Sequence, residues 1–213
     1  EGARMVAEGV EPALVDNAAR LLGMPVGPQQ LIDETSLDVG VKIAKATKAA
    51  LGDKYPADNK PVDDLMFALY DQGRLGRKSK AGFFDYDEAG KRQGYWDGLD
   101  ALTPTLDEQP DLTEVQHRLM FAQVLEAVRA LEEDVLEDIR EGDVGAILGW
   151  GFAPWSGGPF SWLDILGAPY AAERCDQLAQ KFGPRFNCPD LLRDMASKGQ
   201  TFYGRFGKDA KAA

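Results

Sequence analysis

The sequence predicts an all-α fold with one minor β element, built from two tandem helical repeats. Apolar residues recur at helical spacing almost throughout the 213 residues, and strand-like alternation never runs for more than a few positions. The composition is that of a globular protein, with 44% hydrophobic and 28% charged residues. Matching segments also recur in the same order in the two halves of the chain, which indicates an internal duplication.

Four helices are expected in the first half of the chain: Pro12 to Leu22, Pro28 to about Ser36, Val39 to Leu51 and Val62 to Tyr70. A proline suits the first turn of a helix because its missing N–H is not needed there. Gly73 is expected to cap the fourth helix. The aromatic stretch 82–96 then indicates a small hairpin or an aromatic-pinned loop, and residues 97–111 read as a linker.

The second half should open with the longest helix of the chain. Thr113 and Gln116 are expected to form a capping box at its start. Its core face is predicted to contain Phe121, Val124, Leu125, Val128, Leu131 and Val135. A loop rich in glycine and tryptophan should follow over 149–158, and then helices from Pro159 to Leu166, Pro169 to Phe182 and Pro189 to Lys198. The predicted organisation is a first repeat at 1–96, a linker at 97–112 and a degenerate second repeat at 113–207.

Three pairs of segments carry the duplication. Glu1 to Val10 matches Glu126 to Val135, and Gly27-Pro28 followed by Asp33 matches Gly158-Pro159 followed by Asp164. Leu65 and Gly73 match Leu191 and Gly199. Since the second copy has about half a helix in front of Glu126, the first copy is expected to lack that half, and the chain looks cut from something longer.

The duplication also predicts how the copies associate. An isologous contact between two fused copies should have a pseudo-twofold axis. The helix around Val124, Val128 and Leu131 is then expected to pack against its counterpart around Met5 and Val6.

Charge and composition exclude several classes of function. The formal net charge is −11, which makes a nucleic-acid partner a poor first hypothesis. No apolar run approaches the roughly 20 residues that cross a bilayer, so no membrane span is expected. Cys175, Cys188 and His117 are too few and too scattered for a metal site, and the two cysteines are expected to be reduced thiols of a cytoplasmic protein.

Candidate chemical groups each have a structural alternative. Gly73 to Ser79 superficially suggests a phosphate loop, but its spacing is wrong, and its basic residues fit a solvated helix exit better. Asp33 and Asp164 could be paired carboxylates, although orientation of loop amides is favoured. The aromatic residues of the second copy fit an acyl pocket and core packing equally well: Trp150, Trp155, Phe160 and Trp162. No partner is positioned by motif to make a catalytic relay with His117.

Three stretches resemble the C-terminal helical part of multifunctional fatty-acid oxidation enzymes, in the L-3-hydroxyacyl-CoA dehydrogenase family. They are residues 23–33 with Leu37-Asp38-Val39 behind them, residues 73–86, and the degenerate second copy with Leu131-Glu132-Glu133 and 151–159. The resemblance implies a fold like the C-terminal region of 6-phosphogluconate dehydrogenase. It also implies a parent that oxidises 3-hydroxyacyl-CoA with NAD, preceded by an enoyl-CoA hydratase domain.

The resemblance assigns no catalytic, cofactor or metal residue to this chain. In the family the Rossmann domain carries NAD and the catalytic Ser, His and Glu, and an active-site Asn-Arg pair lies in the stretch absent here; the second copy has His117-Arg118 instead. The implied role is one wall of the acyl-CoA cleft, through Met24, Pro25, Gly27, Pro28 and Leu31. The acyl-CoA substrate would be bound with the parent's Rossmann domain, and association with a thiolase subunit stays open. The alternative is a standalone helical binding or assembly module without catalysis.

Overall fold

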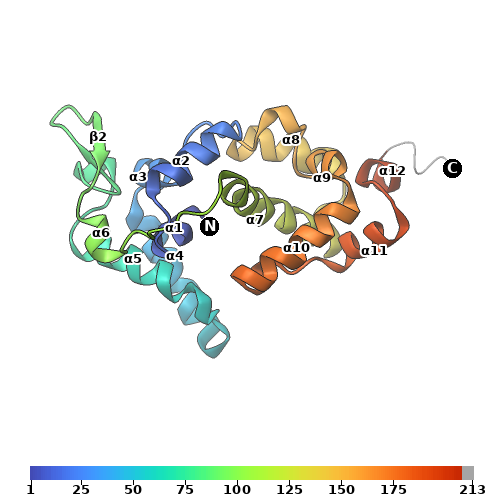
Figure 1. Cartoon of the computed structure of the whole chain (residues 1–213), viewed down its shortest axis with the longest axis horizontal. Coiled ribbons are helices and arrows are strands. Elements are labelled where there is room, and N and C mark those ends of the chain that lie inside the picture. Colours follow the sequence, from blue (N-terminus) through green and yellow to red (C-terminus); the bar gives the residue numbers. More distant parts are fainter. Residues whose placement is uncertain (208–213) are drawn as a thin grey trace. The chain divides into compact units, whose positions relative to one another are not determined.

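The computed structural model describes residues 1–207, which form two compact units (Figure 1). Unit 1 comprises residues 1–21 and 26–115, and unit 2 comprises residues 22–25 and the chain from Gln116 onward. Helices dominate both units, and one two-stranded hairpin is the only sheet in the described residues. The predicted all-α class with a minor β element is therefore confirmed.

Unit 1 consists of short helices and the hairpin. Its helices are α1 (Gly2–Ala7), α2 (Pro12–Leu21), α3 (Pro28–Thr35), α4 (Leu37–Leu51), α5 (Lys60–Asp71) and α6 (Leu99–Leu102). Proline stands at the start of α3 as predicted, and α3 ends at Thr35, before Ser36, whose φ of 74° is unusual for a residue with a side chain. Gly73 adopts a φ of 73° behind α5, as expected at a helix C-terminus.

The hairpin joins β1 (Phe84–Tyr86) to β2 (Arg92–Tyr95) in antiparallel register, with Phe84 opposite Tyr95. The Phe84 and Tyr95 rings lie 4.2 Å apart between centroids. Phe83, just before β1, is completely buried, so the hairpin is anchored to the helices by its first strand.

The segment 97–112 packs against the rest of unit 1. It contains α6, whose Leu99 is buried, and the Leu106 backbone N–H donates to the Gly9 carbonyl at 2.9 Å. The Gln109 side-chain amide donates to the same carbonyl at 3.2 Å. The second part of the segment is thus hydrogen-bonded to the chain at Gly9.

All regular secondary structure of unit 2 is helical within the described residues. The long helix α7 (Leu112–Glu132) begins just before the unit boundary, and α8 (Ile139–Trp150), α9 (Pro159–Leu166), α10 (Ala168–Phe182), α11 (Asp190–Lys198) and α12 (Phe202–Phe206) follow. The core face of α7 holds fully buried Phe121, Val124, Leu125 and Val128, as predicted.

Three details of unit 2 differ from the sequence predictions. The side chain of Asp111, not that of Thr113, caps α7 by accepting from Glu114 N at 2.8 Å, because the helix already begins at Leu112. Val135 is exposed rather than in the core, since α7 ends at Glu132 and Asp134 turns the chain with a φ of 56°. Helix α8 occupies the start of the predicted glycine- and tryptophan-rich loop, which begins only at Gly151.

Candidate functional site

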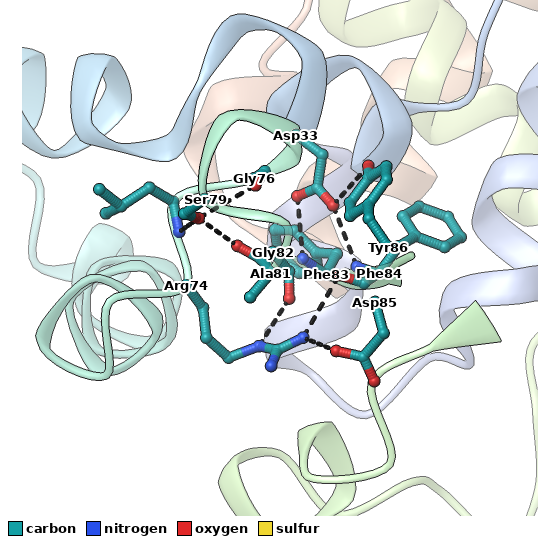
Figure 2. A network of polar contacts seen from close by, with 11 residues as sticks. Asp33, Arg74, Gly76, Ser79, Ala81, Gly82, Phe83, Phe84, Asp85 and Tyr86 are labelled. Carbon is teal, nitrogen blue, oxygen red and sulfur yellow. Dashed lines mark hydrogen bonds and ion pairs between the residues drawn. The ribbon is translucent and has the colours of Figure 1, made fainter. Parts of the chain in front are cut away.

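Asp33, at the end of α3, is the centre of a buried polar network (Figure 2). Its carboxylate accepts hydrogen bonds from Phe83 N at 2.8 Å, Phe84 N at 3.0 Å and Tyr86 Oη at 3.0 Å. A Cβ on Gly82 would lie 2.2 Å from Asp33 Oδ1, so only glycine fits there. Asp33 therefore fixes the entry into the hairpin.

A second aspartate holds the Gly-Pro loop in front of α3. Asp16 on α2 accepts from Gln29 N at 2.9 Å, which satisfies a free N–H in the first turn of α3, and from Tyr95 Oη at 2.9 Å. A Cβ on Gly27 would lie 2.2 Å from the Asp16 carboxyl carbon. Gly27 is thus required by the close approach of Asp16.

Unit 2 repeats the arrangement at the matching positions. Asp143 on α8 accepts from Phe160 N at 2.8 Å and Ser161 N at 3.1 Å, at the start of α9. Asp164 accepts from Phe202 N at 2.6 Å and Tyr203 N at 3.0 Å, as Asp33 does from Phe83 and Phe84. Tyr203 Oη donates to Asp143 at 2.9 Å, in the way that Tyr95 donates to Asp16.

Two arginines form the third recurring feature. Arg4 in α1 pairs with Glu1 at 3.7 Å and donates to the Asp58 carbonyl. Arg129 in α7, at the matching position, pairs with Glu126 and donates to the carbonyls of Arg185 and Asn187, each at 3.1 Å. In unit 1 the arginine thus connects α1 to the segment in front of α5. In unit 2 it connects α7 to the segment in front of α11.

These networks assign Asp33 and Asp164 a structural role, as the sequence favoured. The amides that they orient belong to a segment about 40 to 50 residues later, whereas the Gly-Pro loops are held by Asp16 and Asp143. Sequence reasoning missed Asp16 and Asp143, although their matching positions in the two copies were a usable signal.

The buried carboxylates are electrostatically perturbed. Burial raises the pKa of Asp16 and of Asp33, although hydrogen bonds from backbone N–H groups and tyrosines oppose the effect. Burial and the neighbouring carboxylates also raise the pKa of Tyr86 and Tyr95. Burial is the largest cause of both aspartate pKa shifts, so they follow from the packing around the two carboxyl groups.

The basic loop after α5 is engaged in structural pairs. Arg74 donates to the Gly82 carbonyl at 2.8 Å and to Asp85 at 2.6 Å (Figure 2). Arg77 pairs with Glu34 at 3.1 Å, and Lys78 pairs with Asp38 at 2.5 Å. Arg77 and Lys78 are about half exposed, as expected for a solvated helix exit, whereas the Arg74 side chain is only 11% exposed.

The remaining chemical candidates lie in unit 2. Arg174 Nε donates to His117 Nδ1 at 2.8 Å, and Cys175 and Cys188 are free thiols whose side chains hydrogen-bond each other. Phe160 and Trp162 are buried in unit 2, whereas Trp150 and Trp155 are exposed. The described residues contain no cluster of three or more potential metal ligands.

The five residues expected to bind substrate do not share one environment. Gly27 is buried against Asp16, Pro28 is half-buried beside Gly2, and Leu31 is exposed on α3. Met24 and Pro25 belong to unit 2, where Pro25 is exposed and Met24 half-buried. The neighbouring Trp155 donates its Nε1–H to the Leu22 carbonyl at 2.6 Å, which fixes the start of this segment.

Residues 1–86 match the family described as "3-hydroxyacyl-CoA dehydrogenase, C-terminal domain". The chain is 38% identical over 207 residues to the fatty acid oxidation complex subunit alpha of Shewanella amazonensis, and 37% identical over 206 residues to that of Shewanella loihica. Each alignment covers 95% of this chain, which spans 28% of the length of these curated relatives.

Solved structures show the same fold. The dehydrogenase part of multifunctional enzyme 1 from C. elegans aligns with a TM-score of 0.65 and 21% identity, over 90% of this chain and 44% of that one. The 3-hydroxybutyryl-CoA dehydrogenase of Escherichia coli K12 aligns with a TM-score of 0.65 and 19% identity, over 93% and 57% respectively.

Within the described part of the chain, no helix combines the length and apolar character of a membrane span. The chain is similar in sequence to subunits of fatty acid oxidation complexes and in fold to dehydrogenases. Residues 1–86 therefore carry the C-terminal domain of the 3-hydroxyacyl-CoA dehydrogenase family, and the chain is similar over 95% of its length to alpha subunits of fatty acid oxidation complexes.

Proposed function

We propose that this chain is the helical, substrate-facing part of an NAD-dependent L-3-hydroxyacyl-CoA dehydrogenase of fatty-acid β-oxidation. The observation that carries the proposal is its similarity over 95% of its length to alpha subunits of fatty acid oxidation complexes, together with the family match at 1–86. The larger polypeptide would supply the NAD site and the catalytic groups. The hydratase activity of the parent, a thiolase partner and a cytoplasmic location stay predictions.

The proposed contribution to acyl-CoA binding lies at the segment Met24–Pro25. Pro25 is exposed, and the Trp155 indole, which is 60% exposed, lies beside Gly23 in the same unit. An exposed apolar surface of this kind suits an acyl or pantetheine chain. Gly27 and Pro28 would position the segment through the Asp16 network rather than contact the substrate.

Reconstitution tests the proposal. The chain is co-expressed with the remainder of the polypeptide encoded by its gene, and acetoacetyl-CoA-dependent oxidation of NADH is measured. We expect activity from the combination and none from the chain alone. Absence of activity from a folded combination that binds NAD would favour the alternative, a helical binding module without catalysis.

Trp155→Ala then tests the proposed surface in the active combination. We expect KM for acetoacetyl-CoA to rise about tenfold with little change in kcat, because the lost contact serves binding. Trp150→Ala is the matched control, since Trp150 is equally exposed and its indole donates to Gln123 instead. Equal effects of the two substitutions would contradict the assignment of this surface.

A further inference from the structure

Unit 1 leaves one side of α3 and α4 without a covering element. Leu31, Val39, Ile43 and Leu51 expose 50%, 46%, 61% and 42% of their surfaces. The last three are spaced by four and eight residues, which places them on one face of α4. Grouped exposed apolar side chains indicate a surface that is normally occupied.

In unit 2, α7 contacts the corresponding surface. The residues 131 positions later are Trp162, Tyr170, Arg174 and Phe182. All four contact a single stretch of α7, residues 117–121. The Phe121 and Trp162 rings lie 5.4 Å apart, and those of His117 and Tyr170 lie 6.4 Å apart.

Two polar contacts complete the same interface. Arg174 Nε donates to His117 Nδ1 at 2.8 Å, and the Arg118 guanidinium lies 4.0 Å from the centroid of the Phe182 ring. Each exposed apolar residue of unit 1 therefore has a counterpart that α7 contacts in unit 2.

The correspondence is structural as well as sequential. α4 and α10 both have 15 residues, and each begins after a residue with a rare backbone conformation, Ser36 at φ 74°, ψ 125° and Gly167 at φ 83°, ψ 132°. α1 in turn corresponds to the second half of α7, as the equivalent contacts of Arg4 and Arg129 show. Residues 117–121, which contact the corresponding surface in unit 2, lie in the first half of α7.

Gln29 adds a second, independent observation. Its side chain is fully buried, and neither its amide nitrogen nor its amide oxygen has a hydrogen-bond partner in the described residues. Its counterpart Phe160 packs against Phe202 at 5.2 Å between rings. The amide lies close to Gly2, at the first turn of α1, where a preceding helical turn would bring further polar groups.

We propose that the face formed by Leu31, Val39, Ile43 and Leu51 is the docking site of a helix that continues α1 in front of Glu1. That helix would place its apolar residues on the face as residues 117–121 do in unit 2. Leu31 then belongs to this interface rather than to the acyl-CoA surface.

Hydrogen–deuterium exchange can test the proposed helix. The chain is compared with a version extended by the residues that precede Glu1 in its gene, about 14 of them, as α7 has in front of Glu126. We expect amide exchange in α4 to slow by about tenfold in the extended chain, because a docked helix suppresses local opening. Unchanged exchange, a dimer that buries the face instead, or a reading frame without these residues would overturn the proposal.

A pair of substitutions separates docking from general stabilisation. Ile43→Asp should abolish the slower exchange of the extended chain and lower its Tm by several degrees, with little effect on the 213-residue chain. Ala49→Asp adds the same charge to an exposed position on another side of α4 and should leave both properties unchanged. Equal effects of Ile43→Asp in both chains would contradict docking at this face.

Discussion

At the scale of single residues, the carboxylate of Asp33 accepts hydrogen bonds from Phe83 N, Phe84 N and Tyr86 Oη. Removing it in Asp33→Ala would leave two buried N–H groups without an acceptor, so we expect a loss of about 3 kcal/mol in the free energy of unfolding. Urea unfolding measures the change. Asp85→Ala, which removes only the half-exposed partner of Arg74, should cost much less. Similar losses for the two variants would show that the buried network is not the main source of the effect.

The titration of Asp33 gives a second test with a definite sign. Burial raises its pKa above the ordinary value of 3.8, so the folded protein retains the proton to higher pH than the unfolded chain. Its contribution to stability is full below about pH 3.8 and is lost as pH rises through the raised pKa. The stability advantage of the wild type over Asp33→Asn should therefore shrink as the pH rises from 3 to 7. An advantage that grows with pH would mean that the pKa is lowered.

At the scale of secondary structure, α8 contains glycines in contrasting surroundings. A Cβ on Gly145 would meet no atom within 4 Å, whereas one on Gly142 would lie 2.7 Å from both Leu136 and Phe160 side chains. Gly145→Ala should therefore stabilise the protein by about 0.5–1 kcal/mol through helix propensity alone. Gly142→Ala should lower the Tm despite the same gain in propensity. Thermal unfolding compares the two, and a destabilising Gly145→Ala would show that α8 is constrained by something other than these contacts.

The same helix shows where sequence reasoning succeeded and where it failed. Glycine and proline marked the starts of α3 and α9 well, because backbone restrictions act locally. Bounds for α8 did not follow from the sequence, because Gly142, Gly145 and Gly149 weaken its helix propensity. Burial of Ile139 and Ala146 stabilises it, and the Asp138 side chain caps it by accepting from Arg140 N. The sequence placed the cap of α7 at Thr113, two residues after the observed cap Asp111, because a threonine hydroxyl offers the same capping chemistry.

At the scale of the whole chain, both units hold a pair of aspartates with hydrogen bonds, although they use polypeptide segments of different length. Unit 1 uses Tyr86 and Tyr95, on the two strands of the hairpin, to donate to Asp33 and Asp16. Unit 2 has Tyr203 alone in the equivalent role and no hairpin in its described residues. Sequence comparison between the copies found the Gly-Pro loops and their following aspartates. It could not find Asp16 and Tyr95 as partners, because the two residues are 79 positions apart in the chain and meet only in the folded unit.

The last prediction concerns the binding of NAD by the isolated chain. The described residues contain no parallel sheet with a glycine-rich turn, which is the structure that binds a dinucleotide in Rossmann domains. We therefore expect 1 mM NAD to leave the Tm of the isolated chain unchanged. A site with a Kd of about 10 μM would stabilise the fold by about 2.7 kcal/mol at that concentration, which corresponds to a rise of several degrees. The reconstituted combination, which is expected to contain the NAD site, serves as the positive control. A comparable rise for the isolated chain would show that it has a dinucleotide site of its own.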